Sequence, residues 1–159
     1  MRLLFTSNDR FLSKLIRKGL QEPISHLAIA STNGAVFHAT MQGVEVISLR
    51  EFLKDNDIVY TYKLSCAMSE TDTVQFLLDN CVRSQYDIGA LFYLGWRTLL
   101  RLVFRVPFPK RNRMDINSAY LCTEIVKYVK DPIFTKKIEG IDLAMTTPYG
   151  LYKLLIGKE

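Results

Sequence analysis

The sequence predicts an α+β protein in which an antiparallel sheet packs against helices. Two strand-like runs are separated by Asn33-Gly34, and Asn-Gly between such runs is a strong signal of a β-hairpin. Other segments carry apolar residues at the 3.6-residue spacing of a helix. The chain has 159 residues, 48% of them hydrophobic, which suffices for one core but not for two. We therefore expect a single domain over residues 1–159.

The first half of the chain alternates strands with short helices. Strand composition is found in residues 2–6, 25–30, 35–40, 43–47 and 57–65. Residues 11–20 have the apolar spacing of a helix. Ser48 and Glu51 have the spacing of a capping box, so a short helix is predicted to begin there and to include Phe52.

The second half predicts mainly helices. Ser69 caps a helix that runs to about Arg83. Its inner face is expected to carry Val74, Leu77, Leu78, Cys81 and Val82. A second helical pattern covers residues 87–104, and a loop with two prolines follows at 106–113. Further along, residues 117–126 lead into a helix that must end before Pro132, and Thr147-Pro148-Tyr149-Gly150 predicts a turn.

Basic residues are concentrated in one segment, although the net charge is only +5. Between positions 97 and 113 there are six basic residues and no acidic one: Arg97, Arg101, Arg105, Lys110, Arg111 and Arg113. Such a run is more often a solvated face than a binding site, but it suits an anionic substrate or partner. The apolar stretch 88–106 contains three of these arginines, so we expect a buried helix with a basic edge and no transmembrane segment.

The cysteines and the N-terminus bear on the compartment. Cys66, Cys81 and Cys122 are odd in number and show no CxxC spacing, so neither a disulfide framework nor a cysteine zinc finger is predicted. The N-terminal residues lack the apolar run of a signal peptide. We therefore expect synthesis in the cytoplasm; later release as a virion or secreted-cargo component stays open.

Cysteine chemistry needs a thiol, a base and a polar group that orients the base. The chain has only two histidines, His26 and His38, and they fall on the two arms of the predicted hairpin. Cys122 is the only cysteine expected at the start of a helix, where the dipole lowers a thiol pKa. Cys66 and Cys81 are interpreted as core residues.

Ser25-His26-Leu27-Ala28-Ile29 resembles the histidine strand of the permuted NlpC/P60 group of papain-like cysteine hydrolases, the YiiX-like and lecithin retinol acyltransferase-like branch. In that branch the histidine strand precedes the cysteine, the reverse of the order in papain. The similarity extends over nearly the whole chain, through Val36-Phe37-His38-Ala39, Gly43-Val44-Glu45-Val46, Leu49, Tyr86-Asp87, Leu121-Cys122-Thr123-Glu124-Ile125-Val126 and Thr147-Pro148 with Leu151.

The resemblance implies a circularly permuted papain-like fold with Cys122 as nucleophile, His26 as general base and then acid, and His38 as the group that orients His26. The backbone N–H of Cys122 would hold the oxyanion, with the Tyr86 side chain as a further donor. Two positions depart from the family pattern. YiiX-like members commonly have glutamate at the position of His38, whereas the acyltransferase branch has a histidine about there, and Thr123 replaces the usual serine. Glu124 is interpreted as a stabiliser of the first helical turn.

The predicted reaction is thiol-dependent hydrolysis through a thioester and needs no cofactor. Amide bonds of peptidoglycan or of peptides are the first expected substrates. One alternative is a lipid acyl hydrolase or acyltransferase of the same fold. A second is a catalytically idle structural or binding module of a larger assembly, for example in a phage. A third is a zinc site formed by His26, His38 and Cys122.

Overall fold

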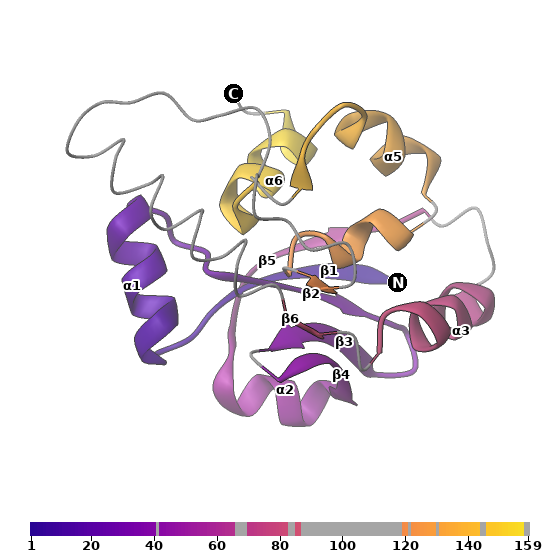
Figure 1. Cartoon of the computed structure of the whole chain (residues 1–159), viewed down its shortest axis with the longest axis horizontal. Coiled ribbons are helices and arrows are strands. Elements are labelled where there is room, and N and C mark those ends of the chain that lie inside the picture. Colours follow the sequence, from indigo (N-terminus) through magenta and orange to yellow (C-terminus); the bar gives the residue numbers. More distant parts are fainter. Residues whose placement is uncertain are drawn as a thin grey trace.

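The computed structural model describes residues 1–40, 42–65, 70–82, 85–86, 119–120, 122–129, 131–143 and 146–157 (Figure 1). Several predictions lie outside these residues: the second long helix at 87–104, the loop at 106–113 with the six basic side chains, and Cys66. The described part is a mixed α+β fold built on a five-stranded antiparallel sheet, as the sequence predicts.

The strands of this sheet are β1 (Arg2–Ser7), β2 (His26–Ala30), β3 (Ala35–Thr40), β4 (Gly43–Ser48) and β5 (Asp57–Lys63), arranged in the order β4-β3-β2-β1-β5. β2, β3 and β4 form a meander, and the β2–β3 turn contains Gly34 with φ of +87°. Only glycine adopts such a conformation without steric cost, which explains the Asn-Gly signal.

One face of the sheet is covered by α2 (Leu49–Asp55), and we call it the α2 face. The Oγ of Ser48 accepts a hydrogen bond from the Glu51 N–H at 3.1 Å, so the helix begins at the predicted cap. Phe52 is fully buried against a small apolar cluster formed by Leu4, Ala28, Ala30 and Val36. These residues alternate with those of the other face because successive strand residues point to opposite sides of a sheet.

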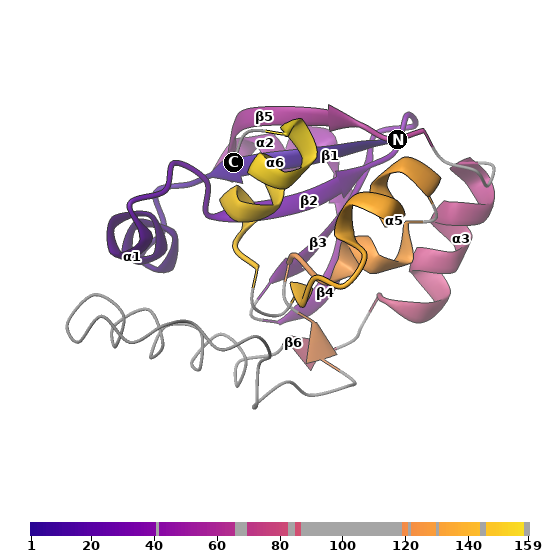
Figure 2. The same ribbon diagram turned by 90° about the horizontal axis from the view of Figure 1, so that it is seen from above.

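The opposite face carries the larger core and is covered by α3 (Glu70–Asn80), a 3₁₀ helix η1 (Ile125–Tyr128), α5 (Pro132–Ile138) and α6 (Pro148–Ile156). We call it the α5/α6 face. Figure 2 shows α5 and α6 lying along this side, while α1 (Phe11–Leu20) lies at one end of the sheet. The sheet residues of this core are Leu3, Phe5, Leu27, Ile29, Phe37 and Ala39, together with others nearer the edges.

Two local predictions were wrong, and proline explains one of them. Pro132 and Pro148 each occupy the first position of a helix, where a missing N–H costs nothing, with Asp131 and Thr147 as the caps. The predicted turn at Thr147 is therefore a helix start. The predicted α-helix after Cys122 is a turn followed by the four-residue η1.

The prediction for the inner face of α3 was correct in part. Leu77 is fully buried and Cys81, just beyond the helix, is buried too, whereas Leu78 is 39% exposed. Thr73 occupies an inward position instead, because it lies one helical turn before Leu77. Among the described residues, no helix is long and apolar enough to cross a bilayer.

A two-stranded parallel pair lies beside the main sheet. It joins β6 (Gln85–Tyr86) to β7 (Ala119–Tyr120), and both strands contact the edge strand β4. β7 ends two residues before Cys122, so this pair leads the chain to the candidate nucleophile.

Candidate active site

His26 and His38 come together on the α2 face, and we call them the histidine pair. His26 opens β2, where it lies opposite Thr6 of β1, and His38 lies opposite Ala28 of β2. Their ring centroids are 5.6 Å apart, with the planes at 77°. The hairpin therefore brings the two imidazoles into edge-on contact, as the Asn-Gly turn predicts.

Phe52 of α2 packs against both rings of the histidine pair. Its ring centroid lies 5.3 Å from that of His38 and 6.2 Å from that of His26. His38 is only 8% exposed, whereas His26 is partly exposed. Among the described residues, Nε2 of His38 and Oγ1 of the buried Thr6 have no hydrogen-bond partner. Buried polar atoms of this kind mark a place where water or a ligand is expected.

Burial keeps both imidazoles neutral at physiological pH. Burial, with smaller effects from His38 and Arg10, lowers the pKa of His26 to about 3. The pKa of His38 is also lowered by burial; Glu45 acts in the opposite direction, and Arg10 adds to the lowering. The Arg10 guanidinium is held by Asp55 of α2 at 2.5 Å. A neutral imidazole can accept a proton, but a pKa of about 3 makes His26 a weak base, because a general base is most effective when its pKa is near the working pH.

Cys122 lies where the pairing of β2 with β3 ends. The last pair of that ladder is Ala28–His38, although β3 continues to Thr40. The backbone N–H of the next β2 residue, Leu27, instead donates a hydrogen bond toward the sulfur of Cys122. The N–H groups of Thr123 and of Cys122 itself also face this sulfur. The sulfur thus has three backbone donors around it.

This contact sets the separation between Cys122 and the histidine pair. Because the Leu27 N–H that faces the sulfur belongs to the peptide bond after His26, the sulfur lies beside the backbone of His26. The Cys122 side chain belongs to the core of the α5/α6 face, whereas the His26 ring packs on the α2 face. The described contacts include no hydrogen bond between this sulfur and either imidazole.

The two described cysteines have similar acidity. Burial raises the pKa of Cys122 to about 11, and burial also raises the pKa of Cys81 to about 11. For Cys122 the three N–H donors act against burial, while the Glu124 carboxylate adds to the increase. The expected low pKa at a helix start is not found, because η1 has only four residues and the thiol is only 8% exposed.

The residues that follow Cys122 have structural partners. Oγ1 of Thr123 donates to the carbonyl oxygen of Leu143 at 2.9 Å, which ties this turn to the segment before α6. Glu124 is 4% exposed and lies 3.7 Å from Nζ of Lys127. Tyr86 has its backbone in β6, opposite Tyr120 of β7, and the position of its side chain lies outside what the structure describes.

The zinc alternative finds no support in the described part of the chain. No group of three histidine, cysteine, aspartate or glutamate side chains there lies close enough to hold a metal ion.

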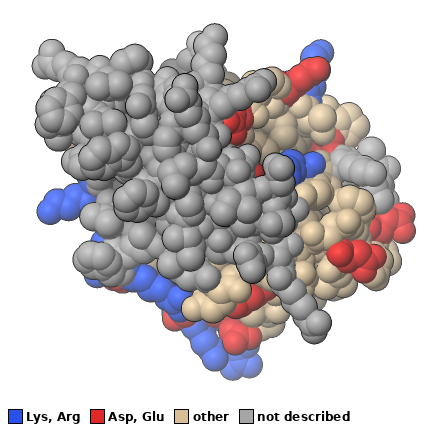
Figure 3. Space-filling view, in the orientation of Figure 1, with Lys and Arg blue, Asp and Glu red and all other residues tan. Residues whose placement is uncertain are grey.

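The charged residues of this part are mixed in sign on the face seen in Figure 3.

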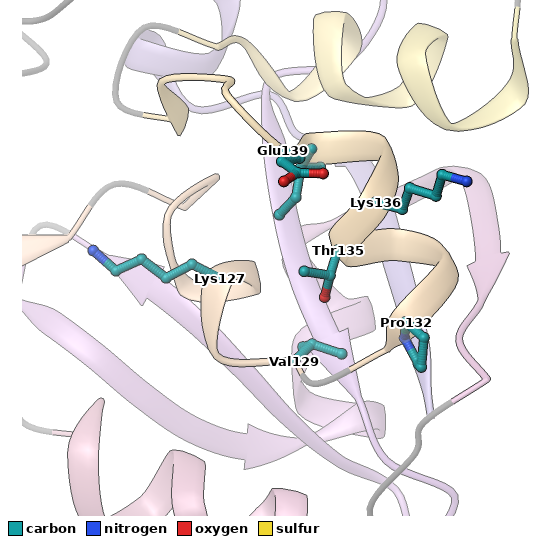
Figure 4. A pocket seen from close by; sticks show the side chains of 7 residues that line it. Lys127, Val129, Pro132, Thr135, Lys136 and Glu139 are labelled. Atoms are coloured by element: carbon teal, nitrogen blue, oxygen red, sulfur yellow. The ribbon is translucent and has the colours of Figure 1, made fainter.

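An open groove between η1 and α5 lies near the Cys122 segment without including it (Figure 4). It is lined by Lys127, Val129, Pro132, Thr135, Lys136, Ile138 and Glu139. Lys127 also approaches Glu124, so this lysine is shared with the turn after Cys122. The groove contains neither member of the histidine pair.

Comparison with family models, with curated proteins and with solved structures returned no match. The family resemblance therefore stays a prediction that depends on the residues quoted above.

Sequence reasoning overlooked three neighbours of the histidine pair. Phe52 was assigned only to a short helix, and Arg10 and Glu45 were given no role. Glu45 could have been found from the hairpin pattern, because two residues after Gly43 it must lie opposite His38 if β3 and β4 pair at Thr40–Gly43. Nothing in the sequence indicates that Arg10, before α1, approaches the pair.

Proposed function

We propose that this chain is a thiol-dependent hydrolase in which Cys122 is the nucleophile and His26 transfers the proton. The observation that supports this most directly is the hydrogen bond from the Leu27 N–H toward the Cys122 sulfur, next in sequence to an imidazole that is neutral at pH 7. The chain order, with the histidine strand before the cysteine, fits a permuted papain-like arrangement on the antiparallel sheet.

The reaction starts from a neutral thiol and a neutral imidazole. His26 takes the thiol proton as the sulfur attacks the substrate carbonyl carbon, and the oxyanion that forms is met by backbone N–H groups near the sulfur. When the tetrahedral intermediate collapses, the leaving amine takes the proton from His26 and a thioester remains on Cys122. Water then hydrolyses the thioester and the thiol is restored. His38 orients His26 throughout.

This sequence of steps requires the His26 ring to reach the sulfur through the gap where β2 and β3 part. The sulfur lies beside the peptide bond that follows His26, which supports a local movement. A change in the side-chain rotamer of His26, away from Phe52, is the movement that we propose.

Amide bonds of peptidoglycan or peptides are the first proposed substrates. Lipid esters are the second, and His38 is the feature that favours them, since the acyltransferase branch carries two histidines. In a transferase the acyl group would pass from Cys122 to an amine or alcohol instead of water. A binding module without activity is a separate candidate, favoured by the high pKa of Cys122 and by the lack of a hydrogen bond between its sulfur and either imidazole.

The test is an assay of peptidoglycan fragments, peptides and lipid esters with the wild type, Cys122→Ala and Cys81→Ala. Cys81 is the matched control, because it is also buried and its pKa is also about 11. Loss of a nucleophile should reduce kcat/KM by about a thousandfold or more, while Cys81→Ala retains activity. Equal activity of Cys122→Ala and wild type on every substrate that is turned over would refute the assignment.

The binding-module candidate is decided by mass spectrometry. An enzyme incubated with excess acyl donor should carry the acyl group on Cys122 and on no other cysteine. Absence of both turnover and adduct across the panel would favour a module that only binds.

A further inference from the structure

Glu45 lies directly opposite His38 on the neighbouring strand β4. Residues opposite one another in an antiparallel pair project to the same face with Cβ atoms about 4.5–5.5 Å apart, so the Glu45 carboxylate shares the α2 face with His38. On β3, Oγ1 of Thr40 lies 3.3 Å from Oε1 of Glu45 and 3.2 Å from the carbonyl oxygen of Gly43, so its single proton is shared between these two acceptors. The same Oγ1 accepts from the Gln42 N–H at 3.1 Å, which orients the hydroxyl.

Among the described residues, Glu45 is the acidic group that acts on His38. It favours the charged form of His38, whereas burial and Arg10 oppose that form. On the other elements around the pair, Asp55 of α2 is bound to Arg10, and β1 contributes the uncharged Thr6. Glu51 of α2 has no effect on the pKa of either imidazole.

We propose that Glu45 is the positioning residue of the histidine pair and acts through His38, where its negative charge stabilises the proton that arrives when Cys122 attacks. This inference rests on the proposed function. A proton taken by His26 places positive charge in a buried site 5.6 Å from a second imidazole and close to Arg10. A negative charge beyond His38 offsets that cost, which is greatest when the proton has been transferred.

The experiment compares Glu45→Gln with Glu51→Gln in the full chain. Glu51 is exposed on α2, so the control removes the same charge near the same face. NMR titration of the imidazole Cε1–H signals should show a lower pKa for His38 in Glu45→Gln and no change in Glu51→Gln. On a substrate of the wild type, Glu45→Gln should lose about tenfold in kcat at unchanged KM, equivalent to about 1.4 kcal/mol. Glu45→Asp, which keeps the carboxylate, should recover part of the loss.

Two further measurements keep this inference separate from the proposed function. The titration does not need activity, so inactivity of Cys122 would leave the His38 result intact. If Glu45→Gln does not fold, Thr40→Val removes the hydroxyl that contacts the carboxylate while keeping the shape, and a smaller decrease in the His38 pKa is expected, because the charge of Glu45 remains. An unchanged His38 titration in every folded variant would overturn the role of Glu45 even if Cys122 proves essential.

Discussion

At the scale of single residues, the local surroundings decide the charge of each candidate group. The histidine pair and Cys122 are all neutral near pH 7, because burial disfavours imidazolium and thiolate alike. A thiolate–imidazolium pair is thus not the resting state of the described structure. Proton transfer must accompany attack on the substrate, and this requirement makes the protonation of Cys122 the first quantity to measure.

The first prediction concerns alkylation of Cys122 by iodoacetamide. With a pKa of about 11, about one thiol in ten thousand is ionised at pH 7. Because the thiolate reacts, the rate should rise about tenfold per pH unit between pH 7 and 9, without a plateau. Peptide-level mass spectrometry can follow Cys122 and Cys81 in the same sample. A plateau for Cys122 below pH 8 would reveal a preformed thiolate and contradict this prediction.

The second prediction concerns acid stability. Folded His26 stays neutral down to about pH 3, whereas an unfolded histidine titrates near pH 6.5. Below pH 6.5 the unfolded chain therefore binds a proton that the folded chain does not. The free energy of unfolding therefore does not depend on the titration of His26 above pH 6.5. Between pH 6.5 and pH 3 it falls by about 1.4 kcal/mol for each pH unit.

His26→Gln removes this dependence. Urea unfolding at pH 7.5, 5.5 and 4.5 should show the variant gaining stability relative to wild type as the pH falls. The free-energy difference between the two proteins should be constant above pH 7, which serves as the internal control. Parallel stability curves down to pH 4.5 would show that His26 titrates normally in the folded protein.

At the scale of helices and strands, capping explains where the elements begin. Asp131 is the most connected cap: its Oδ1 accepts from the N–H groups of Ile133 at 2.9 Å and Phe134 at 3.0 Å, and its Oδ2 accepts from the Ser65 N–H. The carboxylate is 2% exposed. It therefore joins α5 to the chain segment that follows β5.

The third prediction is that Asp131→Ala reduces the free energy of unfolding by about 2–3 kcal/mol, because buried N–H groups lose their acceptor. Asp131→Asn keeps one acceptor oxygen and should cost less. Thr147→Ala, which removes the single cap bond of α6 to the Gly150 N–H, should cost about 1 kcal/mol. Urea denaturation measures all three. Equal losses for the two Asp131 variants would show that the oxygen kept in Asp131→Asn contributes nothing through its bonds to Ile133 and Phe134.

The same elements show what the sequence could predict. The segments of α1, α2 and the β2–β3–β4 meander were predicted closely, because turn chemistry, capping and apolar spacing act within a few residues. The helix starts at Pro132 and Pro148 were missed because proline was interpreted as a break, although it also suits the first turn of a helix. Leu78 was assigned inward since apolar spacing alone does not fix the edge of a buried face.

At the scale of the whole molecule, the pairing of distant strands was beyond prediction. β1 lies between β2 and β5, and the pairing of Phe5 with Tyr60 has no local signal. The contact of the histidine pair followed from the hairpin, but the position of Cys122 depends on β6, β7 and the packing of η1, which no pattern near Cys122 encodes. For this reason the contact between the two histidines was predicted, whereas the position of Cys122 relative to them was not.

The fourth prediction is about the edge strand β5. Its residues are mostly exposed, but Tyr60 stacks on Tyr152 of α6 with ring centroids 4.0 Å apart. Tyr60→Ala should therefore reduce stability by about 1–2 kcal/mol through lost aromatic contact. Thr61→Ala on the same strand is the control and should cost less. Hydrogen exchange of β5 should increase more in Tyr60→Ala than in the control, and equal exchange would indicate that the stack does not hold the edge.

The strand order also has a consequence for how the chain folds. β2, β3 and β4 pair with immediate neighbours, whereas β5 pairs with β1, which is far away in the sequence, and closing that longer loop costs more chain entropy. We expect the meander to belong to the folding nucleus and β5 to join late. Gly34→Ala, strained at φ of +87°, should then mainly slow refolding, while Val59→Ala in β5 should mainly accelerate unfolding. The sheet thus acquires its last strand, and its most exposed edge, after the histidine-bearing hairpin has formed.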